Sequence, residues 1–211
     1  MQNTNPLQIT FDTKEEYDEF LLKTYEDQLT AVYRDGWTII ERILPPILKN
    51  VEGCIVEIGM GASTPMFAKF AERQDITLHS CDKSPRKIIQ PLFPKHKIYQ
   101  MFSFDFMKTF DDTPAIVFLD GSHEYDVVKK EFEFFLDKLT EGGIIFIHDT
   151  GAPEEQFLND TACGDIWKLR QEIERRRDVD CLTWPYTAIN CGLTMILKRE
   201  VDAPYWRACG R

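Results

Sequence analysis

The chain has 211 residues and a formal net charge of −10, and 43% of its residues are hydrophobic. This hydrophobic fraction supports a sizeable core and excludes a chain that is disordered by composition. Proteins bind nucleic acids largely through Lys and Arg side chains that displace counterions, so the acidic balance argues against a DNA or RNA partner and favours a small molecule.

Residues 1–50 are expected to form a helical extension or cap in front of one domain over residues 51–211. Apolar side chains recur near helical spacing through residues 13–33, which is the pattern of an amphipathic helix. A second helix is expected over residues 37–48, where the consecutive prolines at 45–46 should kink it.

From residue 53 onward, short apolar runs alternate with helical segments. We predict strands over residues 54–58, 76–81, 97–101, 115–119 and 144–148, and helices over residues 65–73 and 125–139. This alternation implies an α/β fold in which a parallel sheet is covered on both faces.

The C-terminal part follows a different pattern. A helix near residues 166–176 is followed by strand-like runs at 179–184 and 191–198, which only a few residues connect. Because a parallel crossover needs a longer connection, these two strands should pair antiparallel.

The turn after the first strand contains two glycines, Gly59 and Gly61. Without a Cβ atom, their backbone can turn tightly and lie against a ligand. The next helix, which Thr64 is expected to cap, offers free N–H groups at its start. A purely structural turn between a strand and a helix would contain the same residues, so this pattern leaves both interpretations open.

Asp82 follows the second predicted strand, where its carboxylate can accept hydrogen bonds from both hydroxyls of a ribose. Capping of the next segment is its alternative role. Thr64 occupies the place of the third glycine of a dinucleotide fingerprint, and the Glu57 carboxylate just before the first glycine would repel a pyrophosphate. Both residues favour a nucleoside with a cationic amino end over NAD.

At these positions the sequence resembles class I methyltransferases that use S-adenosylmethionine (SAM). Glu57–Gly61 looks like their motif I, Asp82 matches their acidic residue after strand two, and Ser103–Asp105 resembles the stretch that contacts the adenine. Asp120–His123 and Gly142–Asp149 are similar to a subgroup of small-molecule O-methyltransferases. In that subgroup the fourth strand ends in Asp-Gly-x-His and the fifth in His-Asp.

The resemblance, which covers residues 50–200, implies a Rossmann-like, doubly wound, mostly parallel seven-stranded sheet with an antiparallel C-terminal hairpin. It also implies that SAM is the cofactor. Glu57, Gly59 and Gly61 would line its methionine part. Asp82 would bind the ribose, Ser103–Asp105 the adenine, and Asp120 would lie near the methyl group. The candidate cofactor residues are Glu57, Gly59, Met60, Gly61, Asp82, Lys83, Ser103, Phe104, Asp105 and Asp120.

Four polar side chains follow predicted strand ends and should converge, because ligands in open α/β sheets sit there: Asp120, His123, His148 and Asp149. In one arrangement, Asp120 and Asp149 hold a divalent cation such as Mg²⁺, which lowers the pKa of a substrate hydroxyl. Thr150 stands where catechol-type enzymes have an Asn, so Thr150 or water would complete that site.

In the other arrangement His123 is a general base, which makes Asp120 and His123 the candidate catalytic residues. A structural contact at the start of the following helix is the alternative role of His123. His148 ends an apolar strand and is expected to be structural.

The leading hypothesis is O-methylation of a small hydroxylated molecule, such as a sugar or a specialised metabolite; an N-methyl acceptor stays open. An NAD-dependent oxidoreductase and a non-catalytic cofactor-binding subunit are the alternatives. In similar enzymes an N-terminal extension is often the dimerisation or specificity element, so residues 1–50 are where we expect homodimer contacts.

The six cysteines are scattered without a CxxC pair or a zinc-like spacing, which suits free thiols in a reducing cytoplasm. The first residues show no basic region followed by an apolar stretch, so no signal peptide is predicted. No apolar run approaches the ~20 residues that span a bilayer. We therefore expect a cytoplasmic protein without membrane contact.

Overall fold

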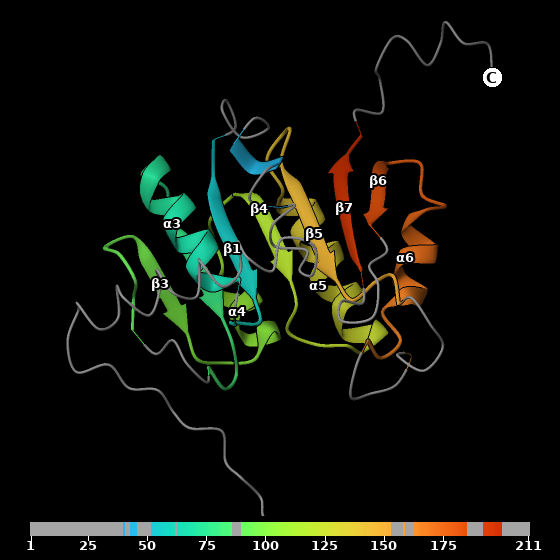
Figure 1. Cartoon of the computed structure of the whole chain (residues 1–211), viewed down its shortest axis with the longest axis horizontal. Helices are drawn as coiled ribbons and strands as arrows, with labels where there is room; N and C mark the ends of the chain where they lie inside the picture. The colour runs from blue at the N-terminus through green and yellow to red at the C-terminus, as the bar shows by residue number, and fades with distance from the viewer. Residues whose placement is uncertain are drawn as a thin grey trace, which may run out of the picture.

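Strands and helices alternate along the described part of the chain (Figure 1). The computed structural model describes residues 40, 43–45, 52–61, 63–85, 90–152, 158, 163–184 and 192–199. The strands are β1 (Cys54–Ile58), β2 (Leu78–Cys81), β3 (His96–Tyr99), β4 (Pro114–Leu119), β5 (Ile144–His148), β6 (Val179–Trp184) and β7 (Leu193–Lys198). The helices are α3 (Thr64–Gln74), α4 (Ser103–Thr109), α5 (Tyr125–Lys138) and α6 (Trp167–Ile173).

The strands form one seven-stranded sheet in the order β3-β2-β1-β4-β5-β7-β6. The first five strands of the chain pair in parallel. β7 lies between β5 and β6 and runs antiparallel to both, with Trp184 opposite Leu193 in the hairpin. The predicted mostly parallel, Rossmann-like sheet with an antiparallel C-terminal hairpin is confirmed.

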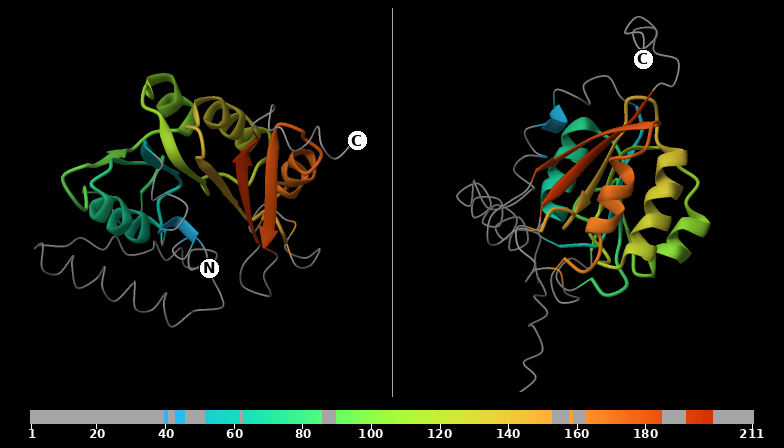
Figure 2. Two further views of the ribbon diagram at one scale, coloured as in Figure 1. Left: turned by 90° about the horizontal axis from the view of Figure 1, so that it is seen from above. Right: turned by 90° about the vertical axis from the view of Figure 1, so that its right-hand side faces the viewer.

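Helices cover both faces of the sheet. Because side chains along a strand point alternately to either side, the strands contribute to two apolar clusters. In β5, Ile145 and Ile147 join the apolar cluster beneath α4, α5 and α6. Ile144 and Phe146 join a second cluster beneath α3. Figure 2 shows these helices on opposite sides of the sheet. Every residue of β4 is buried, as expected for a strand covered on both faces.

Two local predictions near the site are wrong. α3 begins at Thr64 itself, so Thr64 does not cap it. The preceding residue, Ser63, makes no side-chain cap, and its hydroxyl donates to Glu57. The segment Ser103–Thr109 forms α4, where no helix was expected. The Phe106 ring of α4 is buried and lies 4.7 Å from the Tyr99 ring, so tertiary packing stabilises a helix that lacks a side-chain cap.

The helix expected over residues 13–33 lies outside the described residues. In the helix expected over residues 37–48, Ile40 and residues 43–45 are helical. Ile40 and Leu44 are fully buried in the apolar cluster on the α3 face. The boundary between an N-terminal extension and the domain stays a prediction.

The expectation of free thiols is wrong for Cys163, which is disulfide-bonded to a partner outside the described residues. Cys54, Cys81 and Cys181 are free. Spacing along the sequence does not show which distant cysteine approaches Cys163 in the fold, because disulfide geometry depends on the positions of the two Cα atoms in space.

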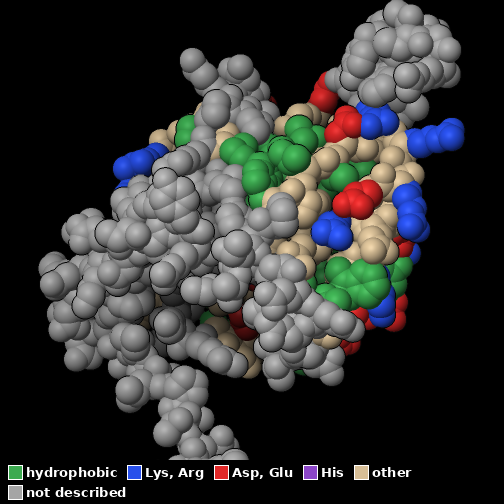
Figure 3. Space-filling model, turned by 45° about the vertical axis from the view of Figure 1, so that its right-hand side comes forward, with side chains coloured by type: hydrophobic (Ala, Val, Ile, Leu, Met, Phe, Trp, Pro, Cys, Tyr) green, Lys and Arg blue, Asp and Glu red, His purple; other side chains and the backbone are tan. Residues whose placement is uncertain are grey.

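Charged side chains of both signs are mixed on the face where β6 and α6 come forward (Figure 3). Arg176, in the middle of the basic run, bonds to Asp178 at 2.6 Å and also to Glu133 of α5. The middle of this run is therefore paired with acidic side chains. No described helix combines the length and the apolar character that crossing a membrane requires.

Candidate active site

The ends of β1 and β4 meet at Gly59, where the backbone leaves no room for a side chain. Gly59 has a φ of 92°, and a Cβ atom there would lie 2.4 Å from the backbone oxygen of Asp120. The Asp120 N–H donates to the Ile58 oxygen at 2.8 Å, which fixes this close approach. Glycine at position 59 is thus required by the packing of the two strands, before any ligand is considered.

The Glu57 side chain is fully buried beneath this turn. Its carboxylate accepts hydrogen bonds from the hydroxyls of Ser63 at 2.5 Å, Thr64 at 3.0 Å and Ser80 at 2.8 Å. Burial raises the pKa of Glu57 to about 7, although the three hydroxyls oppose this shift. Glu57 therefore fastens the glycine turn to β2 and α3, and its direct contact with a cofactor stays a prediction.

Asp82 organises the same turn from the end of β2. One carboxylate oxygen accepts the Met60 N–H at 2.9 Å and the other accepts the Ser84 N–H at 2.6 Å. Each oxygen of a carboxylate can accept a second hydrogen bond. Asp82 can therefore hold the turn and still bind a ligand hydroxyl.

A cavity of about 310 Å³ opens at these strand ends. It is lined by Ile58, Gly59, Cys81, Asp82, Lys83, Met101, Phe102, Ser103, Phe104, Gly121, Ser122, Glu124, Val127 and Glu131. Five of the predicted cofactor residues are among them: Gly59, Asp82, Lys83, Ser103 and Phe104. The other five candidates, Glu57, Met60, Gly61, Asp105 and Asp120, are not in the lining.

Phe102 stands out in this lining because 62% of it is exposed, more than any other large hydrophobic residue in the described part of the chain. An exposed aromatic ring beside this cavity offers a flat apolar face on which a nucleobase can stack. The segment before α4 thus supplies the kind of surface that the predicted adenine contact needs.

The four polar residues after β4 and β5 converge beside this cavity, as expected. The His123 Nε2 atom lies 2.9 Å from Asp149 Oδ2. The His148 Nδ1 atom lies 3.1 Å from Asp120 Oδ1 and 3.1 Å from Asp149 Oδ1. Asp149 adopts a left-handed backbone with a φ of 60°, which is strained for a residue with a side chain.

These contacts set the charges of the cluster. Burial alone would raise the pKa of Asp149, but the hydrogen bonds from His123 and His148 outweigh it and hold this pKa well below its usual range. Burial would lower the pKa of His148, but the charge of Asp120 and the bonds to both carboxylates raise it to about 10. The bond to Asp149 also raises the pKa of His123.

Thr150 makes hydrogen bonds within the fold, and its place beside a cation stays a prediction. Thr150 is fully buried, and its hydroxyl lies 2.7 Å from the Thr194 hydroxyl of β7. Thr194 in turn lies 2.8 Å from the Thr183 hydroxyl of β6. These three hydroxyls form a chain that fastens the segment after β5 to the C-terminal hairpin.

Sequence reasoning missed two residues of the site. His148 was expected to be structural, yet it lies between both carboxylates of the cluster. Glu131 of α5 lines the cavity although it is buried among apolar residues of its helix. A single acid on the apolar face of the helix predicted over residues 125–139 was the signal for Glu131.

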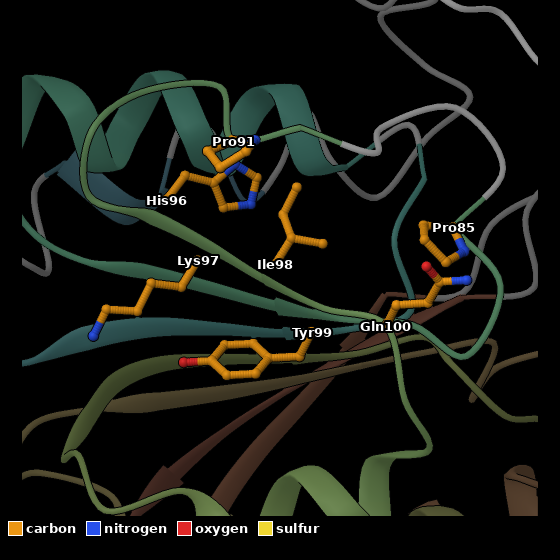
Figure 4. Close-up of a pocket in the computed structure, with 7 residues that line it drawn as sticks. All are labelled: Pro85, Pro91, His96, Lys97, Ile98, Tyr99 and Gln100. Carbon is orange, nitrogen blue, oxygen red and sulfur yellow. The ribbon is translucent and has the colours of Figure 1, made fainter.

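Two further features lie away from this site. Cys54, His79 and Asp112 also offer three ligand atoms within 4.8 Å of one another, at the opposite end of the strands. A cavity of about 520 Å³ lies along the edge strand β3 (Figure 4) and is lined by Pro85, Pro91, His96, Lys97, Ile98, Tyr99 and Gln100. Neither feature contains a predicted site residue.

Comparison with known proteins points to one class. Residues 56–150 match the family model described as a methyltransferase domain. No curated protein sequence matches the chain.

Three solved structures illustrate the likeness of the fold. Cofactor-bound Rv0187 from MTB is 15% identical, with 90% of this chain and 100% of that chain covered and a TM-score of 0.63. The Podospora anserina methyltransferase PaMTH1, solved with S-adenosylhomocysteine (SAH) bound, is 17% identical, with coverage of 93% and 100% and a TM-score of 0.62. MycE, a methyltransferase of the mycinamycin biosynthetic pathway solved with Mg, SAH and mycinamycin VI, is 18% identical, with coverage of 87% and 56% and a TM-score of 0.57.

The matched segment begins in β1 and ends just after Asp149, so it spans both the cavity and the cluster. Together with the Rossmann-like sheet, this match supports a SAM-dependent methyltransferase as the class of the protein. The alternative of an NAD-dependent oxidoreductase is not favoured.

Proposed function

We propose that this protein transfers the methyl group of SAM to a hydroxyl of a small molecule, such as a sugar or a specialised metabolite. One observation carries the proposal: the cavity and the acid–histidine cluster share one loop. Gly121 and Ser122 line the cavity, and their neighbours Asp120 and His123 belong to the cluster. A cofactor in the cavity would therefore present its reactive end to the cluster.

The lining suggests how SAM would lie. Asp82 would accept hydrogen bonds from the ribose hydroxyls, while Phe102, Ser103 and Phe104 would surround the adenine. The methionine part would then run along the turn at Gly59 toward Asp120. This placement follows the resemblance residue by residue, and it is supported by the five predicted residues that line the cavity.

His123 is the residue that we propose as the general base. Its Nε2–H donates to the buried Asp149, which orients the ring and makes it a stronger base. Among the described residues His123 Nδ1 has no hydrogen-bond partner, so it is available to take the proton of an acceptor hydroxyl. Methyl transfer is an in-line displacement, so a positioned base and an aligned acceptor are its main requirements.

Asp120 and Asp149 also suit a divalent cation such as Mg²⁺, and we include such a cation in the proposal. Asp120, His123 and Asp149 each offer one ligand atom, and these atoms lie within 4.8 Å of one another. When bound, a divalent cation lowers the pKa of a hydroxyl that it contacts. MycE, which shares the fold, was solved with Mg. His148 balances the charge of both carboxylates from the protein side.

Isothermal titration tests the cofactor. The wild-type protein should bind SAH and should not bind NAD; the reverse result would refute the proposal. Asp82→Asn should weaken SAH binding by about tenfold or more, because a hydrogen bond to a charged group contributes ~1.5–3 kcal/mol. Asp111→Asn is the matched control, because Asp111 is an exposed acid at the other end of the sheet.

Release of SAH in the presence of hydroxylated small molecules tests catalysis. Turnover should be lost in His123→Gln while SAH still binds, and it should fall with EDTA and return with Mg²⁺. Indifference to EDTA together with loss in His123→Gln would assign deprotonation to His123 alone. Unchanged turnover in both His123→Gln and Asp149→Asn would remove the cluster from the mechanism.

We also propose that residues 1–50 form a cap over the acceptor side and contribute homodimer contacts. The burial of Ile40 and Leu44 against the α3 face supports an extension that packs on the domain. Light scattering of the full chain tests the assembly, and a monomeric mass would refute the dimer.

A further inference from the structure

Glu131 is a buried acid with one carboxylate oxygen that has no partner. Only 1% of Glu131 is exposed, and Oε2 makes no hydrogen bond with any described residue. Ser103 at the start of α4 supplies one hydrogen bond to the carboxyl group. An unpaired buried polar atom costs about 1–3 kcal/mol, so a position like this one calls for an explanation.

The packing of α5 gives no reason for an acid at this position. Val128, Phe132 and Phe135 surround Glu131 on the buried face of the helix, where an apolar side chain would leave no orphan atom. The acid Glu133, on the same helix, pairs instead with Arg176. Burial raises the pKa of Glu131 to about 7, and the carboxyl group retains an acceptor oxygen in either protonation state.

The surroundings of Glu131 indicate what the orphan oxygen meets. Glu131 lines the cavity together with Ser103, to which it is bonded, and with Phe102 and Phe104. These are the residues around the proposed adenine position, whereas Asp82 belongs to the ribose position. Glu131, whose carboxyl group carries the unpaired oxygen, therefore lines the part of the cavity that would receive the edge of the base.

We propose that Glu131 selects the nucleobase of the cofactor, with Oε2 accepting a hydrogen bond from the 6-amino group of adenine. This inference rests on the proposed function. An acceptor at this place favours a base that carries an amino donor at position 6. It disfavours hypoxanthine, because the carbonyl oxygen at position 6 of that base would face a second acceptor.

The test compares two ligands that differ only at the base: SAH and S-inosylhomocysteine. By isothermal titration, the wild-type protein should bind SAH at least about tenfold more tightly, the loss expected when a buried hydrogen-bonding site meets the wrong group. In Glu131→Gln, Ser103 retains the amide oxygen and the amide nitrogen takes the place of Oε2 as a donor. The preference for SAH should then fall at least about tenfold, through weaker SAH binding and stronger inosyl binding.

Glu124→Gln is the matched control. Glu124 lines the same cavity but is exposed, so this change removes one negative charge from the wall without touching the orphan oxygen. The preference should stay at its wild-type value. An equal fall in Glu124→Gln would mean that general charge sets the preference, and it would overturn the proposal.

Two outcomes separate this inference from the proposed function. If the wild-type protein binds SAH but Glu131→Gln leaves the preference unchanged, the role of Glu131 is refuted and the proposed function stands. If the wild-type protein binds neither ligand, the proposed function fails as well. Should Glu131→Gln not fold, the wild-type protein is titrated with the analogue of SAH that lacks the 6-amino group. Affinity equal to that of SAH would overturn the proposal, and affinity at least about tenfold weaker would support it.

Discussion

Replacing each glycine of the turn after β1 with alanine separates packing from ligand contact. At Gly59, the new Cβ would lie 2.4 Å from the backbone oxygen of Asp120 and 2.6 Å from the Gly121 nitrogen. A side chain at a φ of 92° adds backbone strain of order 1–3 kcal/mol, and overpacking adds ~1–3 kcal/mol. Gly59→Ala should therefore lower the free energy of unfolding by about 2–6 kcal/mol, a large share of the ~5–15 kcal/mol of a typical domain.

Gly61→Ala is the contrasting variant, because a Cβ atom there meets nothing within 4 Å. Its free energy of unfolding should stay within about 0.5 kcal/mol of the wild-type value. If SAM lies along the turn, however, the added methyl group occupies ligand space, and the affinity for SAH should fall. Gly61 would then be needed for the ligand and Gly59 for the fold.

Urea unfolding followed by circular dichroism measures the first effect, and isothermal titration with SAH measures the second. A Gly59→Ala protein with the wild-type urea midpoint would refute the close approach of the β1 and β4 ends. A Gly61→Ala protein with unchanged SAH affinity would refute the predicted cofactor contact at position 61, while the packing argument at Gly59 would stand.

Three further predictions follow from buried or exposed side chains. The folded-state pKa of Glu57 is about 7 against an ordinary 4.5, so the folded state binds the extra proton and loses stability as the pH rises between these values. Glu57→Gln removes this titration. The free energy of unfolding of the variant minus that of the wild type should therefore rise by about 3 kcal/mol from pH 4.5 to 7, measured by urea unfolding. No pH dependence of this difference would contradict the shift. Thr194→Val leaves the buried hydroxyl of Thr150 and the partly buried hydroxyl of Thr183 without their shared partner. It should cost about 1–3 kcal/mol by the same measurement, and a cost near zero would show that the hydroxyl chain does not stabilise the fold. Phe102→Ala should weaken SAH binding by titration with little change in melting temperature, because most of this ring is exposed; unchanged affinity would exclude stacking on Phe102.

Much of the fold could be predicted from the sequence, because apolar runs and turn residues mark the strands. β1, β5 and β6 have the predicted bounds, and the short connection before β7 correctly indicates antiparallel pairing. The start of α3 was predicted less well. Thr64 is the first residue of the helix, and its hydroxyl accepts the Gly61 N–H and donates to the buried Glu57 carboxylate. Local propensity yields to a tertiary hydrogen bond at this point.

The site was predictable to the extent that it depends on strand ends. Asp120 and Asp149 each follow a parallel strand, so their convergence follows from topology. The partners of His148 and Glu131 were not predictable, because pairing across the sheet and between α4 and α5 depends on side-chain positions that spacing does not specify. Asp149 also has a left-handed backbone, which the sequence pattern does not predict.

The position of β7 has a consequence for how the protein reaches its active form during synthesis. β5 pairs with β4 on one side, but its other neighbour is β7, which is made almost fifty residues later. The segment after β5 is also held by Thr194 of β7. During translation the cofactor cavity can therefore assemble from β1, β2, β4 and α5 before Asp149 has its final support. Folding on the ribosome would therefore complete the cavity first and the acid–histidine cluster only once Leu193–Lys198 has joined the sheet.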